Sequence, residues 1–193
     1  MQVTKLNVDR RIDDEKLVAR IIEGDVWAKE ALYHRFVHKL TGIVAKLLRN
    51  SADIEDVVQD TFVQAFRDMH QLREPRYVER WLVRIAVHRV HHRFRRRSLM
   101  RKLGLDRSID DEPLVLQTSS ATPQEVRAEL ALLDEAFDAM DIKDRTCFVL
   151  RYLEGFKLEE IAVATGCSLA TAKRRIVQAK RTIDRYVEAS RHG

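Results

Sequence analysis

The chain has 193 residues, and its 35 Lys and Arg exceed its 30 Asp and Glu, which gives a net charge of +5 and a pI near 9.4. A hydrophobic fraction of 45% is enough to form a core and excludes a chain that is disordered by composition. Six glycines and three prolines are too few for a β-sandwich or barrel of many short strands. Because no apolar run exceeds four residues, the sequence predicts neither a transmembrane helix nor a signal peptide.

The first two predicted elements are helices with acidic caps. Asp13 and Asp14 are placed to cap a helix that extends to Glu23 and stops at Gly24, and Asp25 is placed to cap the next helix. Along this second helix apolar residues recur at helical spacing: Leu32, Phe36, Leu40, Ile43 and Leu47. The second helix therefore has an apolar side that faces a core.

A third helix is expected over 53–69, and its first part is acidic, with four acids and no base up to residue 66. Its core stripe consists of Ile54, Val58, Phe62 and Ala65. Its opposite side carries Asp56, Gln59, Asp60 and Val63, which we call the acidic face. Phosphate would repel this face, so it favours a basic protein partner. The alternative is an ordinary solvated helix face.

A fourth helix, expected over 76–97 after Pro75, is strongly basic, since nine bases and no acid lie between residues 80 and 102. One stripe of this helix consists of Arg80, Arg84, His88, His91 and Arg95, and the core side consists of Val78, Leu82, Ile85 and Ala86. Aromatic residues beside these cations, on which unpaired bases could stack, are Tyr77, Trp81 and Phe94. The preceding polar loop, 70–76, is suited to enclosing a flipped base.

Two features of the fourth helix have other interpretations. Trp81 lies at the edge between the basic stripe and the core side, so core packing explains it as well as base stacking does. His88, His91 and His92 have the spacing of metal ligands on a helix. No carboxylate or Cys is near them in sequence and arginines crowd them, so we predict no metal site.

Helical periodicity then fails from residue 98 to residue 121, where acids and a Thr-Ser-Ser cluster predict a linker. Between 106 and 125 there are five acids and one base, so the linker is acidic. Thr122-Pro123-Gln124-Glu125 marks the next helix start, because it combines a Thr cap, Pro at the first helical position and Glu placed for a capping box.

Further helices are predicted at about 123–139, 142–154, 158–165 and 169–189. Between the last two, Gly166 allows a left-handed turn and Ser168 is placed as the cap of the final helix. A short helix, a tight turn and a longer basic helix form the helix-turn-helix layout of DNA-binding proteins.

The final helix divides into three sets of side chains. The inward set is Leu169, Ala172, Ile176, Ala179 and Ile183. The outward set, placed to read base edges, is Thr171, Arg174 and Gln178, and the flanking set, placed to hold phosphates, is Lys173, Arg175 and Arg181. The alternative is an amphipathic hairpin with a basic exterior.

Two basic blocks, 80–102 and 166–193, are separated by the acidic linker, and this pattern favours two contacts with a polyanion. For either block alone a solvated face is the alternative. The expected fold is all-α, with two small helical domains over 1–97 and 123–193 joined by a flexible acidic linker over 98–122.

The two cysteines, Cys147 and Cys167, show neither a metal-ligand spacing nor a disulfide framework. We interpret both as small buried apolar residues in a reducing cytoplasm.

Two groups of motifs resemble a known family. Asp53-Ile-Glu-Asp-Val-Val-Gln-Asp-Thr-Phe-Val-Gln-Ala-Phe66, followed by Trp81-Leu-Val-Arg-Ile-Ala86, resembles region 2 of the extracytoplasmic-function (ECF) sigma factors of the sigma-70 family. Glu154-Gly155-Phe-Lys-Leu-Glu-Glu-Ile-Ala162, with Ser168-Leu-Ala-Thr-Ala-Lys-Arg-Arg175, resembles their region 4. The order and spacing of both groups are specific to the family, whereas the helix-turn-helix alone is shared with response-regulator output domains. The resemblance covers about 15–97 and 123–187, and the length leaves no room for the extra regions of primary sigma factors.

The resemblance implies a cytoplasmic sigma factor with no catalytic activity, no cofactor and no membrane contact of its own. It implies that the acidic face docks on the coiled-coil clamp of the RNA polymerase β′ subunit. It implies that the −10 promoter element is bound and opened by Arg73, Arg76, Tyr77, Arg80, Trp81, Arg84, His88, His91 and Arg95. It implies that the −35 element is read by Ser168, Thr171, Lys173, Arg174, Arg175, Gln178 and Arg181, from a domain that sits on the β flap. The linker would run toward the basic channels of the polymerase, and family habit suggests an anti-sigma factor as a further partner.

Four residues depart from the family pattern. His88 stands where Asn is common and Arg174 where a small polar residue is usual, so the −10 and −35 base preferences are expected to differ. Thr165 and Cys167 replace aliphatic residues in the turn, which we interpret as a packing change.

Two other functions remain to be weighed. A stand-alone helix-turn-helix regulator would need a sensor domain or a dimer surface, and residues 1–97 look like neither. A metal-dependent hydrolase built on the histidines of the fourth helix is disfavoured by the arginines around them.

Overall fold

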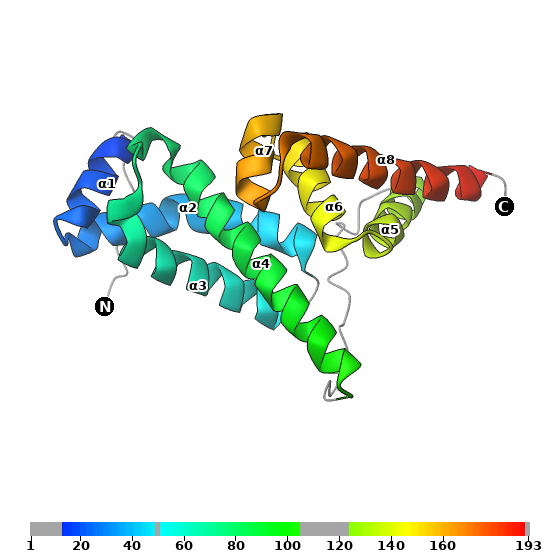
Figure 1. The fold of residues 1–193 in the computed structure, drawn as a ribbon, viewed down its shortest axis with the longest axis horizontal. Helices are drawn as coiled ribbons and strands as arrows, with labels where there is room; N and C mark the ends of the chain where they lie inside the picture. Colours follow the sequence, from blue (N-terminus) through cyan, green and yellow to red (C-terminus); the bar gives the residue numbers. More distant parts are fainter. Residues whose placement is uncertain (1–12, 49–50, 105–123, 192–193) are drawn as a thin grey trace.

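The structure is a computed structural model that describes residues 13–48, 51–104 and 124–191. All regular elements in these ranges are helical, which confirms the all-α expectation (Figure 1). The amino-terminal elements are α1 (Asp14–Ile22), α2 (Val26–Leu47), α3 (Ser51–Asp68), two 3-10 turns (Met69–Gln71 and Pro75–Tyr77) and α4 (Val78–Lys102). The carboxy-terminal elements are α5 (Gln124–Asp138), α6 (Ile142–Phe148), a π-helical turn (Val149–Leu153), α7 (Leu158–Thr165) and α8 (Leu169–Arg191).

Most of the predicted helix ends are confirmed by local geometry. The side chain of Asp25 accepts a hydrogen bond from the Ala28 N–H at 3.2 Å, which caps α2. Gly24 and Gly166 adopt positive φ values of +91° and +63°, which the left-handed turns after α1 and α7 require. Asp13 occupies the cap position of α1, as expected, but its side chain makes no capping hydrogen bond.

The fourth helix differs from the prediction at both ends. Pro75–Tyr77 form a 3-10 turn, so α4 begins at Val78 rather than at residue 76. At the other end α4 continues to Lys102, and residues 98–102 therefore belong to a helix and not to the linker. The expected Thr122 cap and most of the linker lie outside the described residues.

The core is continuous across both halves of the chain. In the amino-terminal half the predicted apolar stripes of α2, α3 and α4 are buried, with Leu32, Leu82 and Ala65 fully enclosed. The same cluster extends into the carboxy-terminal half through Leu150 and Ile161. The two domains are thus packed together, with α4 lying between α2 and α3 on one side and α6 and α7 on the other (Figure 1).

Among the described residues, none of the helices combines the length and the apolar character that crossing a bilayer would require.

Candidate nucleic-acid and protein interfaces

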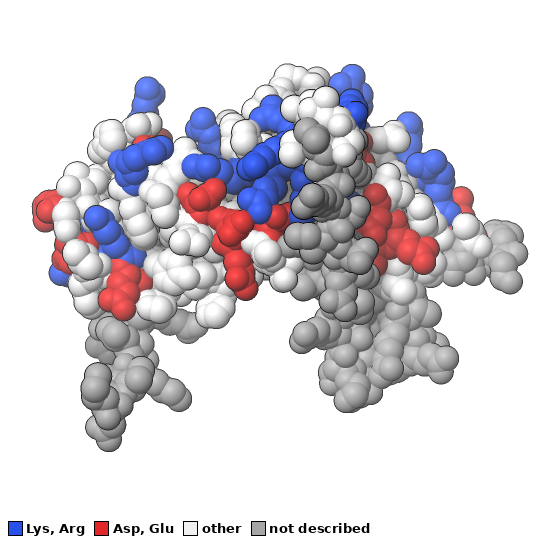
Figure 2. All heavy atoms as spheres, turned by 90° about the horizontal axis from the view of Figure 1, so that it is seen from below, with Lys and Arg blue, Asp and Glu red and all other residues white. Residues whose placement is uncertain are grey.

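The acidic face of α3 is exposed, as the helical spacing predicts. Asp56, Gln59 and Asp60 all face solvent, and Val63 is 61% exposed. The face is less negative than its sequence indicates, because two arginines of α4 reach across to it. Arg93 binds Asp56 at 2.8 Å, and Arg89 lies 3.6 Å from Asp60. On the face shown in Figure 2, acidic and basic side chains likewise lie next to one another rather than in separate fields.

Asp53 anchors this arrangement, and sequence reasoning missed it. The residue is only 4% exposed, and its carboxylate accepts a hydrogen bond from Arg93 Nε at 2.8 Å and pairs with Arg97. Arg93 therefore joins a buried carboxylate to the exposed carboxylate of Asp56. The only signal in the sequence is that Asp53 lies one turn before Val57, on the inward side of the helix.

The predicted −10 residues around the start of α4 are mostly exposed. Arg73, Arg76, Arg84, His88 and Arg95 all face solvent, and Tyr77 is 47% exposed. The guanidinium of Arg76 lies over the Tyr77 ring at 4.7 Å and binds Glu74 at 2.6 Å. Partial burial, followed by Arg84 and Arg95, lowers the pKa of His88, so this imidazole is neutral at pH 7.

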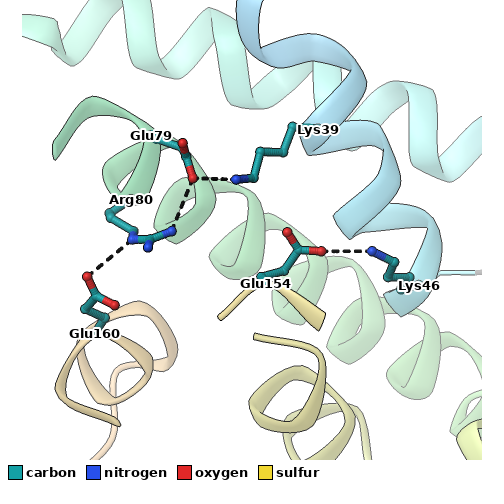
Figure 3. A network of polar contacts seen from close by, with 6 residues as sticks. All are labelled: Lys39, Lys46, Glu79, Arg80, Glu154 and Glu160. Atoms are coloured by element: carbon teal, nitrogen blue, oxygen red, sulfur yellow. Dashed lines mark hydrogen bonds and ion pairs between the residues drawn. The ribbon is translucent and has the colours of Figure 1, made fainter. Parts of the chain in front are cut away.

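Arg80 does not stand free for DNA in this structure. Its Nε donates to Glu160 of α7 at 3.2 Å, and its Nη1 donates to Glu79 at 3.2 Å (Figure 3). Its Cζ lies 3.9 Å from the centre of the Phe156 ring. The helical wheel places Arg80 outward correctly, but the neighbour on that side is the other domain rather than solvent.

His91, another member of the predicted basic stripe of α4, is also directed into the domain interface rather than toward solvent. Its Nε2 lies 3.0 Å from Thr146 Oγ1 of α6. Because the Thr146 hydroxyl donates to the Ile142 carbonyl at 2.6 Å, His91 Nε2 acts as the donor. Burial, followed by Lys143, His88, Arg175 and Arg95, lowers the pKa of His91 to about 4, so the side chain is neutral at pH 7.

Trp81 lies between the two interpretations. It is half-buried and packs against the core, yet it also lines a cavity of about 710 Å³ between the 70–76 loop and α7. Leu72, Tyr77 and Arg84 line the near side of this cavity, and Val163 of α7 lines the far side. The side chain therefore remains partly accessible from this cavity.

The predicted DNA-facing residues of α8 are largely exposed. Lys173, Arg174, Gln178 and Arg181 face solvent. Ser168, also exposed, caps the helix through a 3.2 Å hydrogen bond from the Thr171 N–H, as predicted. Thr171 itself is half-buried.

The burial of two other parts of α8 differs from the helical-wheel expectation, and the inward set needs correction. Arg175 is half-buried beside Asp144 of α6. Burial raises the pKa of the Asp144 carboxyl, and the charge of Arg175 partly offsets this rise. Arg175 is therefore less accessible to phosphate than its flank position on the helical wheel predicts. The inward set also differs from the prediction at both ends. Leu169 is 46% exposed, Ile183 is only half-buried, and Thr182 beside it is buried.

The two cysteines differ in burial. Cys147 is fully enclosed, and burial raises the pKa of its thiol to about 11, which leaves it inert as a nucleophile. Cys167 is only half-buried, contrary to expectation, and lies 3.1 Å from the Thr165 hydroxyl. Within the described ranges, no group of three or more His, Cys, Asp or Glu side chains is placed to hold a metal ion.

With this geometry in view, comparison with known families identifies the chain. Residues 32–99 match the family model described as Sigma-70 region 2, and residues 130–183 match Sigma-70, region 4. Together they cover more than half of the 193 residues. The chain belongs to the sigma-70 family, as an ECF sigma factor, and this is not a family of catalysts.

Similar proteins span almost the whole chain. RNA polymerase sigma-H factor of Pseudomonas aeruginosa is 26% identical over 91% of this chain and 94% of its own length. ECF RNA polymerase sigma-E factor of Salmonella typhimurium is 27% identical over 94% of this chain and 97% of its own length.

Two solved structures share the fold. CnrH, in complex with the cytosolic domain of CnrY, gives a TM-score of 0.64 at 24% identity, over 91% of this chain and 97% of CnrH. The sigma factor RpoE of Bartonella quintana, in complex with the anti-sigma factor NepR, gives 0.67 at 18% identity, over 82% of this chain and 96% of RpoE.

Proposed function

We propose that this chain binds core RNA polymerase and directs it to promoters by recognising −10 and −35 elements. One observation carries the proposal above the others. An exposed acidic face on α3, a cation-rich α4 beside it and a helix-turn-helix formed by α7 and α8 occur in one chain, in the order of the two family regions. A stand-alone regulator would need only the last of these elements.

The polymerase contact is assigned to the acidic face, Asp56, Gln59, Asp60 and Val63. An exposed valine among carboxylates suits a partner that offers a basic helix with an apolar residue. In the polymerase this partner would be the β′ clamp coiled coil, while the carboxy-terminal domain would sit on the β flap. Arg93 and Arg89 already pair with Asp56 and Asp60, so the partner exchanges ion pairs rather than creating them anew.

DNA recognition is divided between two surfaces. The −10 surface comprises the exposed members of the predicted set around α4, among them Arg73, Arg84 and His88. The exposed Tyr77 and the partly exposed Trp81 are available for stacking. The −35 surface is the exposed side of α8, where Arg174 and Gln178 face solvent.

Three further features follow from family membership. An anti-sigma factor is a proposed partner, since the RpoE structure above contains one. The chain is expected to act in the cytoplasm beside the polymerase, without a membrane contact of its own. No catalytic step or cofactor is assigned to it.

Charge reversal of the acidic face tests the polymerase contact. Asp56→Lys with Asp60→Lys should weaken binding to core polymerase while the fold remains, because both residues are exposed and surface ion pairs contribute only about 0–1 kcal/mol to stability. Glu23→Lys with Glu30→Lys makes the same charge change at exposed positions outside α3, directly after α1 and on α2, and is the matched control. Fluorescence titration with core enzyme measures both affinities. Wild-type affinity in the Asp56 and Asp60 double variant would refute the assignment.

A further inference from the structure

The cavity between the 70–76 loop and α7 has the size of a small-molecule site. Its volume is about 710 Å³. Pockets that hold drug-sized ligands are about 300–1,000 Å³, and they often lie where two parts of a protein meet. Here one wall consists of the loop and the first turns of α4, and the other consists of Phe156 and α7. The cavity therefore has both the volume and the position of a ligand site.

Two ion pairs hold the walls together (Figure 3). From one wall to the other, Arg80 Nε donates to Glu160 Oε1 at 3.2 Å. Nearby, Lys46 of α2 binds Glu154, at the end of the π-helical turn, at 2.8 Å. The second oxygen of Glu160 accepts the Lys157 N–H at 2.7 Å, so this carboxylate has a fixed orientation. The cavity is thus formed before a ligand enters it, which lowers the entropy lost on binding.

The near wall presents two aromatic side chains and a cation in a row: Tyr77, Trp81 and Arg84. Their spacing of four and three residues places them on one side of a helix. Tyr77 is 47% exposed and Trp81 is partly exposed, so both side chains are accessible from the cavity. On the far wall, Val163 is 60% exposed. A planar group between the walls can therefore stack on the near wall and pack against an apolar side chain on the far wall.

The charged residues of the lining determine the charge of the ligand. Three arginines and three glutamates line the cavity. Glu160 pairs with Arg80, and Glu74 pairs with Arg76 at 2.6 Å. Among the described residues, the other three charged groups of the lining form no ion pair: Arg73, Arg84 and Glu159. Two cations against one anion leave an excess of positive charge, so the polar part of the ligand is an anion. Guanidinium forks match phosphate oxygens in geometry and charge, so phosphate is the anion that fits best.

We propose that this cavity binds a small aromatic anion of the nucleoside monophosphate class. The base lies between Trp81 on the near wall and Val163 on the far wall. The phosphate meets Arg73 and Arg84. This site goes beyond the proposed function, because it takes a free small molecule rather than DNA or polymerase. A ligand that contacts both walls also raises the stability of the fold that forms the site.

Titration of the full chain with AMP and GMP, followed by isothermal titration calorimetry, tests this proposal. Adenosine and inorganic phosphate, which each carry one half of the ligand, are titrated for comparison. Val163→Trp fills the cavity from α7, and Glu159→Lys replaces the acid of the lining with a cation. Both residues are exposed and belong to neither the polymerase-binding nor the DNA-binding set, so the fold should remain intact. Val177→Trp on α8 and Glu55→Lys on α3 make the same changes at exposed positions that do not line the cavity, and are the matched controls.

AMP or GMP should bind at least about tenfold more tightly than adenosine or phosphate alone, because the ring and the anion are joined in one molecule. Val163→Trp should weaken this binding at least about tenfold, and Glu159→Lys should tighten it about three- to tenfold. The two controls should bind like wild type. The nucleotide should raise the Tm of wild type and of Glu159→Lys but not that of Val163→Trp.

The proposal is overturned if neither nucleotide binds the wild-type chain, or if Val163→Trp, folded by circular dichroism, binds both as tightly as wild type does. Single-stranded DNA of 20 nucleotides distinguishes a free ligand from a base within a strand. Val163→Trp should not weaken binding of this DNA, because the site takes a free nucleotide. Equal losses for the DNA and for AMP would show that the cavity holds a base of the strand, and the free-ligand site would be rejected.

Discussion

Asp53→Asn should destabilise the protein far more than the neighbouring Asp56→Asn. Both carboxylates bind the same guanidinium, that of Arg93, but Asp53 is buried whereas the Asp56 side chain is 57% exposed. Asn has nearly the same volume as Asp, so the substitution removes charge without opening a cavity. The pair of variants therefore compares a buried and an exposed carboxylate of one ion-pair network, in which the buried one also pairs with Arg97.

The magnitude follows from the exposure of the partners. Removing one member of a buried ion pair costs about 3–5 kcal/mol, because the remaining charge stays buried without its partner. Here the side chains of Arg93 and Arg97 are 30% and 35% exposed, and Arg93 still pairs with Asp56 after the substitution. Solvent and this remaining pair reduce the cost, so Asp53→Asn should lower the free energy of unfolding by about 2–3 kcal/mol. Asp56→Asn removes a surface pair and should cost about 0–1 kcal/mol.

Urea unfolding of the purified full chain, followed by circular dichroism at pH 7, measures both losses. The two variants should share the wild-type slope of unfolding free energy against urea and differ in midpoint. Equal midpoints for Asp53→Asn and Asp56→Asn would mean that the buried network does not stabilise the fold, and the role given to Asp53 as an anchor would be withdrawn.

Three other predictions concern the DNA-binding and interface residues. Burial lowers the pKa of His91 to about 4 in the folded chain, against an ordinary 6.5, so the unfolded chain binds the proton more readily. The stability of the fold should therefore decrease as the pH drops from about 6.5 toward 4. Urea titrations at several pH values should show that His91→Gln makes stability less dependent on pH in this range. Arg174→Ala should relax the base preference at one −35 base pair, a discrimination worth about 1–3 kcal/mol. Lys173→Ala should instead weaken binding to all sequences alike and flatten the salt dependence of binding. If Arg174→Ala lowers the affinity for every single-base variant by the same factor, Arg174 is a phosphate contact. Trp81→Ala should reduce transcription from duplex promoters more than from templates with a pre-melted bubble, and equal losses would show that Trp81 only packs the core.

The features that sequence predicted well are local ones. Asp25 and Ser168 cap their helices, and Gly166 takes the left-handed conformation, because each depends on residues within one turn. The buried stripes of α2, α3 and α4 followed from helical periodicity for the same reason. The sequence places the end of α4 too early, because a run of cations without apolar residues gives no sign that the helix continues to Lys102.

The features that sequence missed depend on contacts between distant segments. A helical wheel places Arg80 and His91 on the outer side of α4, but it cannot show that α6 and α7 cover that side. It also cannot show that Asp53 is paired by arginines 40 or more positions later. The sequence therefore predicts which residues form the −10 set, whereas only the structure shows which of them are covered by the other domain.

Transcription by core RNA polymerase tests the central claim most directly. Core enzyme, with and without the full chain, is given fragmented genomic DNA of the source organism, and the 5′ ends of the transcripts are mapped. We predict discrete start sites that appear only when the chain is present and that share two upstream sequence elements, at −10 and −35. The proposed sigma-factor function is contradicted if the chain adds no start sites to those of core enzyme alone, or if the purified chain binds the same DNA tightly and sequence-specifically without polymerase.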